Sequence, residues 1–186
     1  MFVKKAQLLW GLFNGDYAFA GPFSATVDIT DRCNLRCPGC LYHSPIINKI
    51  RPRPDTEKSS DISLSLWRKT CDELYAHGTN TLVITGEGEP LLYDQVFDLI
   101  SIAKERGFFV ILLTNGTKLD TRNMRFMVES QLDVLRVTIW ANSIAEYRRT
   151  YPDADLTNYH RVPLNLKELA IITDGSEFRL QTVLLC

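Results

Sequence analysis

The stretch Phe108-Phe109-Val110-Ile111-Leu112-Leu113 contains six consecutive apolar residues with no polar residue between them. A strand with one face in water would alternate apolar and polar side chains, so this run predicts a strand that is buried on both faces. Strands of that kind belong to parallel sheets, which helices cover. The preceding segment, Asp94 to Arg106, supports this interpretation because Val96, Leu99 and Ile100 recur at helical spacing before Gly107.

The same succession of helix and strand patterns extends along the whole chain. The further predicted strands are Ala25–Thr30, Thr81–Thr85, Val134–Trp140 and Glu177–Leu185. The further predicted helices are one that starts at Ser63 or Ser65 and ends before Gly78, then Thr121–Gln131, Ile144–Thr150 and Leu164–Thr173, the last two separated by Pro152 and Pro163. Strands joined by helical crossovers predict an α/β protein with one parallel sheet.

Composition sets bounds on location and partners. With 21 Lys and Arg against 22 Asp and Glu, the net charge of -1 predicts no general attraction to nucleic acid or to a membrane. The five cysteines are odd in number and three are clustered, which argues against a secreted disulfide framework and predicts a reducing, cytoplasmic location. Residues 1–23 are interpreted as an N-terminal extension, in which Leu8, Leu9 and Phe13 form a short amphipathic helix packed on the domain.

The clustered cysteines lie in Cys33-Asn34-Leu35-Arg36-Cys37-Pro38-Gly39-Cys40, directly after the first predicted strand. Three thiolates in one loop favour a metal site and leave one position of a four-coordinate site open. A structural zinc site is one possibility, since His43 follows closely enough to supply a fourth ligand.

Unusual residues also follow the other predicted strands. The segment Gly86-Glu87-Gly88-Glu89-Pro90 follows the second strand, Thr114 and Asn115 end the third, and Thr138 and Asn142 flank the end of the fourth. The carboxyl ends of parallel strands meet at one rim of a sheet, whether the sheet is open or closes into a barrel. We therefore expect these residues and the cysteine loop to share one ligand site.

The cysteine loop after one strand and the GEGEP segment after the next resemble the radical S-adenosylmethionine (radical SAM) superfamily, over roughly Ser24 to Cys186. The resemblance implies a partial (β/α)6 TIM-like barrel. Residues 24–186 would form its core domain, which is incomplete at the C-terminus because the chain stops after the fifth strand. The last strand would then need a further segment or another chain to cover its edge.

The resemblance also implies the cofactors and their ligands. Cys33, Cys37 and Cys40 would hold a [4Fe-4S] cluster, whose open iron binds S-adenosylmethionine. An electron from a donor such as flavodoxin or ferredoxin would cleave this cofactor to a 5′-deoxyadenosyl radical, which abstracts hydrogen from a substrate. Residues 86–90 would present backbone groups to the cofactor, with Glu87 at a position where most members have glycine. Candidates for ribose or substrate contacts are Thr114, Asn115, Thr138, Trp140 and Asn142.

On this resemblance the chain is predicted to be an enzyme of oxidoreductase chemistry with an unidentified substrate. A peptide or protein substrate is the first interpretation, because Cys-Asn-Leu-Arg-Cys and Glu-Pro-Leu-Leu look like the branch that modifies such substrates. RNA methylation is the alternative that the GEGEP variant suggests, although the near-neutral charge does not favour it. An alternative from another class is a non-enzymatic zinc module of Cys33, Cys37, Cys40 and His43.

Overall fold

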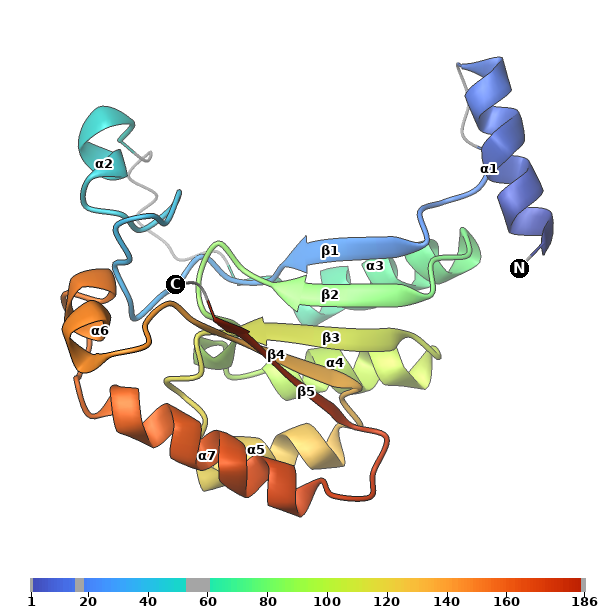
Figure 1. Ribbon diagram of the computed structural model, residues 1–186. Helices are drawn as coiled ribbons and strands as arrows, with labels where there is room; N and C mark the ends of the chain where they lie inside the picture. The colour runs from blue at the N-terminus through green and yellow to red at the C-terminus, as the bar shows by residue number, and fades with distance from the viewer. Residues whose placement is uncertain (1, 16–18, 53–60, 185–186) are drawn as a thin grey trace.

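Five parallel strands form one sheet at the centre of the computed structural model, which describes residues 2–15, 19–52 and 61–184 (Figure 1). The strands are β1 (Ser24–Asp28), β2 (Thr81–Thr85), β3 (Phe109–Thr114), β4 (Val134–Ile139) and β5 (Arg179–Leu184). Their order in the sheet is their order in the sequence, and every neighbouring pair is parallel. The predicted α/β class and parallel sheet are thereby confirmed.

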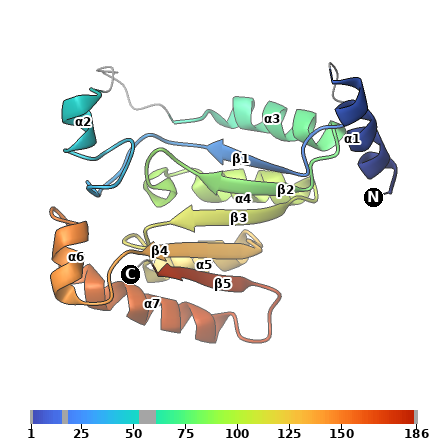
Figure 2. The ribbon, with the colours of Figure 1, turned by 45° about the horizontal axis from the view of Figure 1, so that its top comes forward.

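Helices precede and connect the strands. They are α1 (Phe2–Asn14), α2 (Ile47–Ile50), α3 (Leu64–Ala76), α4 (Val96–Glu105), α5 (Thr121–Glu129), α6 (Ile144–Thr150) and α7 (Asn158–Ile172), with a 3-10 turn at Pro90–Leu92. Because right-handed crossovers join strands that are direct neighbours, α3, α4, α5 and α7 lie on one side of the sheet (Figures 1 and 2). This arrangement is that of a TIM-like barrel, whereas a doubly wound sheet reverses its strand order and places helices on both faces.

One hydrophobic core fills the space between the sheet and these helices. Its fully buried side chains include Leu82, Ile84, Val110 and Leu112 from the strands and Trp67, Leu99, Met127 and Leu169 from the helices. Burial alternates along β3, however, and Ile111 on its opposite face is only half-buried. The prediction of a strand buried on both faces is therefore only half right, because the concave face of a partial barrel has no helix layer.

Glycines end two of the helices where the sequence predicted. Gly78 follows α3 with φ of +79°, and Gly107 follows α4 with φ of +81°. A positive φ strains residues that carry a Cβ atom, so glycine is the residue that closes a helix in this way. At the other end of α3, Ser63 is the N-cap, and its hydroxyl accepts a hydrogen bond from the Leu66 N–H at 3.2 Å.

The predicted start of the last helix is wrong, and one short helix was not predicted. Pro163 does not separate two helical pieces, because α7 begins at Asn158 and runs through it. Proline there removes one backbone donor near the N-terminal end of α7, where the His160 N–H already bonds the Thr157 carbonyl at 3.1 Å in a 3-10 pattern. The short helix α2, which follows the cysteine loop, was not predicted.

The helix predicted near the N-terminus is present as α1, at the end of the sheet opposite to α6 (Figure 1). Its predicted packing on the domain is wrong, since Leu9 is 57% and Phe13 86% exposed. Contact with the domain instead involves Lys4, whose ammonium group donates to the carbonyl oxygens of Pro22 and Gly78. Among the described residues, no helix combines the length and apolar character needed to cross a membrane.

Trp67 offers a direct test of the core. Its side chain is fully buried, and its indole N–H donates to the Leu99 carbonyl oxygen at 2.9 Å, which joins α3 to α4. We expect Trp67→Ala to lower the free energy of unfolding by about 3–5 kcal/mol, since it leaves a large cavity. Leu66→Ala is the matched control, because the adjacent Leu66 is 53% exposed and should change stability by less than about 1 kcal/mol. Denaturant unfolding measures both, and equal losses would contradict this account of the core.

Candidate cofactor site

The three clustered cysteines share a cavity with the glycine-rich segment that follows β2. Cys33, Cys37 and Cys40 line a cavity of about 250 Å³ together with residues 86–90. The cavity is also lined by Leu35, Tyr42, Thr85, Leu113, Thr114, Asn115, Thr138, Trp140 and Tyr151. The structure thus brings together every residue predicted for the site except Asn142, which lines neither this cavity nor the neighbouring one.

Backbone N–H groups of the loop point at two of the sulfur atoms. The Leu35 N–H donates to Cys33 Sγ at 3.5 Å, and the N–H groups of Tyr42 and His43 donate to Cys40 Sγ at 3.4 and 3.3 Å. Burial nevertheless raises the pKa of Cys33. Burial, with a smaller contribution from the two neighbouring thiols, raises the pKa of Cys37 to about 12. These two thiols are therefore neutral at pH 7, and binding of a metal would release their protons.

The segment after β2 packs directly on the backbone that leads into the cysteine loop. The Gly88 N–H donates to the Thr30 carbonyl oxygen at 3.0 Å, and the Glu89 N–H donates to the Arg32 carbonyl oxygen at 2.6 Å. A Cβ atom on Gly88 would lie 2.0 Å from that Arg32 oxygen, and one on Gly86 would lie 2.8 Å from the Thr30 oxygen. Both glycines are thus required by the approach of two loops, a role that the sequence pattern did not reveal.

Glu89 is a buried carboxylate that organises the rim of the cavity. It is 2% exposed and accepts hydrogen bonds from Leu91 N at 3.0 Å, Thr114 Oγ1 at 2.6 Å and Asn115 N at 2.7 Å. Burial raises the pKa of Glu89, while these three donors act in the opposite direction. The carboxylate therefore ties the 3-10 turn to the end of β3, and the Thr114 hydroxyl already has a protein partner.

A salt bridge that the sequence analysis missed secures the start of the cysteine loop. Arg32 Nη2 lies 2.7 Å from Asp61 Oδ2, and the Thr30 hydroxyl donates to Asp61 Oδ1 at 2.6 Å. Asp61 lies 29 residues after Arg32 in the sequence. No local pattern indicates a pairing over that separation, so only the folded chain reveals it.

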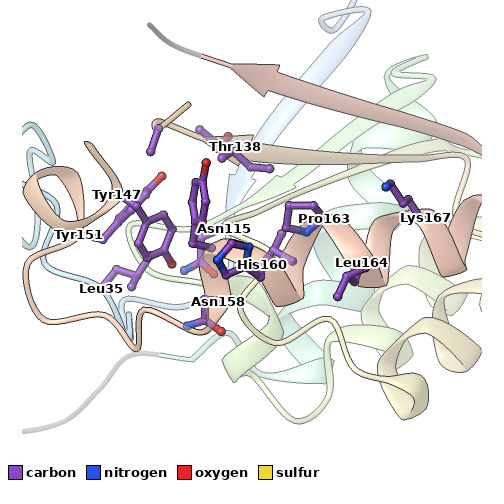
Figure 3. Close-up of a pocket in the computed structure, with 14 residues that line it drawn as sticks. Leu35, Asn115, Thr138, Tyr147, Tyr151, Asn158, His160, Pro163, Leu164 and Lys167 are labelled. Carbon is purple, nitrogen blue, oxygen red and sulfur yellow. The ribbon is translucent and has the colours of Figure 1, made fainter. Parts of the chain in front are cut away.

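A second cavity of about 420 Å³ adjoins the first. It shares Leu35, Asn115, Thr138 and Tyr151 with the thiol cavity. In Figure 3, tyrosines 147 and 151 lie on one side of this space, and His160, Pro163, Leu164 and Lys167 of α7 lie on the other. The Tyr151 hydroxyl accepts a hydrogen bond from Trp140 N at 2.9 Å, and burial raises the pKa of Tyr151 to about 12, so it stays protonated.

These aromatic residues were not predicted as site residues. The available signal was their spacing after the fourth strand, where Tyr147, Tyr151 and Tyr159 recur within α6, the following loop and the first turn of α7. The ring centroid of Tyr147 lies 4.7 Å from that of Tyr151 and 5.8 Å from that of Tyr159. The three rings therefore form one aromatic cluster beside the thiol cavity.

His43, the fourth ligand of the zinc alternative, is not among the residues that line the thiol cavity. Within residues 2–15, 19–52 and 61–184, no three histidine, cysteine or carboxylate side chains form a ready metal cage. The fit to a metal therefore rests on the donor chemistry. Three soft thiols that face one cavity suit iron–sulfur chemistry and leave room for a further ligand.

Three thiols and a glycine-rich segment thus lie together at the carboxyl ends of the strands of a partial TIM-like barrel, the edge at which enzymes of this fold have their active sites. The sequence profile of the Radical SAM superfamily matches residues 27–175. The chain belongs to this superfamily, whose members are enzymes.

Two curated relatives share part of this sequence. The chain is 28% identical over 114 residues to the antilisterial bacteriocin subtilosin biosynthesis protein AlbA of Bacillus subtilis, a match that covers 61% of the chain and 23% of AlbA. It is 26% identical over 112 residues to the Fe-coproporphyrin III synthase of Methanosarcina barkeri, covering 60% of the chain and 26% of that protein. The matches thus span about a quarter of the length of each relative.

Solved structures show the same fold. Streptococcus suis SuiB bound to S-adenosylmethionine superposes with a TM-score of 0.68 at 14% identity, covering 94% of the chain and 37% of SuiB. Methylornithine synthase (PylB) superposes with a TM-score of 0.59 at 16% identity, covering 86% of the chain and 43% of PylB. At these identities the likeness concerns the fold, and it agrees with the predicted partial TIM-like barrel.

Proposed function

We propose that this chain is the cofactor-binding core of a radical SAM enzyme. Cys33, Cys37 and Cys40 would hold a [4Fe-4S] cluster, and the cavity beside residues 86–90 would hold S-adenosylmethionine. The observation that carries the proposal is that these three thiols and the glycine-rich segment line the same cavity. When bound, the cluster would supply the electron that cleaves S-adenosylmethionine to a 5′-deoxyadenosyl radical for hydrogen abstraction.

The surrounding residues have defined tasks in this proposal. Gly86 and Gly88 let the segment after β2 lie against the cysteine loop, so that backbone groups of residues 86–90 can meet the cofactor. Asn115 and Thr138 line both cavities and would contact the part of the cofactor or substrate that extends from one cavity into the other. The apolar Leu35 also lines both cavities and would help to exclude water from the reacting atoms.

For the substrate, we propose a peptide or protein. The support is twofold: a relative whose name places it in the biosynthesis of the bacteriocin subtilosin, and the Cys-Asn-Leu-Arg-Cys and Glu-Pro-Leu-Leu segments. RNA methylation is less well supported, because the net charge of -1 provides little attraction to a phosphate backbone. A cytoplasmic location and a small electron-transfer protein as reductant belong to the same proposal.

Anaerobic reconstitution of the full-length protein with iron and sulfide tests the proposed function. We expect about four irons and matching sulfide per chain, a brown colour, and 5′-deoxyadenosine once dithionite and S-adenosylmethionine are added. Metal analysis and chromatography of the products measure these quantities. One zinc per chain in a colourless protein would instead support the structural zinc site, and a complete cluster that yields no 5′-deoxyadenosine would contradict the proposed reaction.

A further inference from the structure

Three side chains from two distant parts of the sequence form a closed ring of hydrogen bonds beside the thiol cavity. Asn34 Nδ2 donates to Thr117 Oγ1 at 2.8 Å, and Thr117 Oγ1 donates to Asn115 Oδ1 at 2.6 Å. Asn115 Nδ2 then donates to Asn34 Oδ1 at 3.1 Å, which closes the ring. Each of the three side chains thus donates once and accepts once around the ring.

The backbone fixes the direction of this ring. The Thr117 N–H donates to Asn115 Oδ1 at 2.9 Å, so that atom of the amide must be the oxygen. The Thr117 hydroxyl then gives its proton to the same oxygen and is left to accept from Asn34. Hydrogen bonds that run in one direction polarise one another, so loss of one member weakens the other bonds as well.

The ring connects the cysteine loop to the junction of the two cavities. Asn34 lies between Cys33 and Leu35 in the loop, whereas Asn115 lines both cavities. Thr117 lines neither cavity and is 6% exposed. Its hydroxyl can therefore affect a bound cofactor only through the two asparagines.

The backbone around Thr117 is itself held firmly. Gly116 has a φ of +75°, which turns the chain after β3, and a Cβ atom there would lie 2.9 Å from methyl groups of Val137 and Val162. Arg161 of α7 donates from Nη2 to the Thr117 carbonyl oxygen at 3.3 Å. A hydroxyl placed by such a turn can position the cysteine loop that it contacts.

We propose that this ring is a clasp that fixes the cysteine loop against the end of β3, and that Thr117 is a positioning residue for the cofactor. The clasp rests on the proposed function, since its purpose is to set the distance between the cluster loop and the occupant of the adjoining cavity. Loss of the Thr117 hydroxyl removes two of the three bonds of the ring and leaves the bond from Asn115 Nδ2 to Asn34 Oδ1, so the cysteine loop is held less firmly against the end of β3.

Thr117→Val and Thr117→Ser in the full-length protein test the clasp. Valine keeps the shape and loses the hydroxyl, whereas serine keeps the hydroxyl and should behave as the wild type. We expect amide hydrogen exchange of residues 33–40, measured before iron loading, to be about tenfold faster in Thr117→Val, as loss of two hydrogen bonds implies. In the loaded protein, the change that S-adenosylmethionine causes in the electron paramagnetic resonance signal should need about tenfold more cofactor.

The outcomes separate the clasp from the proposed function. If Thr117→Val matches the wild type in exchange and in cofactor requirement, or if Thr117→Ser is as impaired as Thr117→Val, the clasp is wrong. If the wild type assembles no [4Fe-4S] cluster, or its signal does not respond to S-adenosylmethionine, the proposed function fails. In that case the exchange measured before iron loading still decides whether the hydroxyl holds the loop.

Discussion

Gly88→Ala is expected to lower the free energy of unfolding by about 3 kcal/mol and the rate of 5′-deoxyadenosine formation by about 100-fold. The new Cβ atom would lie 2.0 Å from the Arg32 carbonyl oxygen. The oxygen is a backbone atom, and the Cβ atom is bonded directly to the backbone. Neither can rotate away, so residues 86–90 must move by about 1 Å from the cysteine loop, a displacement large enough to misplace bound reactants. Denaturant unfolding and product chromatography measure the two effects.

Gly39→Ala is the matched control within the same site. A Cβ atom on Gly39 would lie 3.7 Å from the Trp140 ring, an ordinary contact distance, and among the described residues no other atom outside its chain neighbours comes within 4 Å. This variant should therefore keep its stability within about 0.5 kcal/mol and retain most of its activity. Equal losses in the two variants would show that added volume in the loops, rather than the approach of Gly88 to Arg32, determines the effect.

Cys37→Ala is expected to lower the bound iron well below the wild-type value and to reduce 5′-deoxyadenosine formation by more than about 100-fold. Loss of a residue that only hydrogen-bonds to a metal ligand typically costs up to about 100-fold, so loss of a ligand should cost more. Removal of one of the three thiols would leave two irons of the proposed cluster without a protein ligand. The variant should still fold, because Cys37 is only half-buried in a loop outside the main core. Iron analysis, circular dichroism and the cleavage assay together measure these expectations.

Cys71→Ala provides the comparison for this loss. Cys71 is fully buried on α3 within the main core, and burial raises its pKa to about 11, so the thiol is neutral. Its replacement should lower stability by about 1–2 kcal/mol but leave iron content and cofactor cleavage unchanged. An iron loss in Cys71→Ala that equals the loss in Cys37→Ala would contradict the assignment of the loop cysteines as ligands.

Local sequence patterns were sufficient to predict most of the fold. The apolar run that became β3 indicated a covered parallel sheet, and Gly78 and Gly107 marked helix ends, because these signals depend on neighbouring residues alone. Pro163 misled the prediction, since α7 runs through this proline and tolerates the loss of one backbone donor. The exposed face of α1 also escaped prediction, because an amphipathic pattern does not state which surface the helix meets.

The position of the candidate site was predictable from the sequence, but the residues that support it were not. Cys33, Cys37 and Cys40 and the GEGEP segment each follow a predicted strand, which placed them at one rim of the sheet, and they line one cavity. Their roles as cluster ligands and cofactor contacts stay predictions from the radical SAM resemblance. The tyrosines of the second cavity and the bridge between Arg32 and Asp61 had no sequence signal of comparable strength. These residues meet through packing between elements, which no single motif encodes.

The amino-acid sequence by itself determined the parallel α/β class and the radical SAM resemblance, because periodicity, thiol spacing and turn residues act over short distances along the chain. The cysteine ligand set stays a prediction from that resemblance. Only the tertiary structure decided that the strands follow one another in order, that Gly88 touches the backbone of Arg32, and that Thr117 joins Asn34 to Asn115. In the sequence, Asn34 lies 81 residues before Asn115 and 83 residues before Thr117. Contacts of such separation arise when the curled sheet brings strand ends to one rim, and that closure depends on the packing of the whole chain.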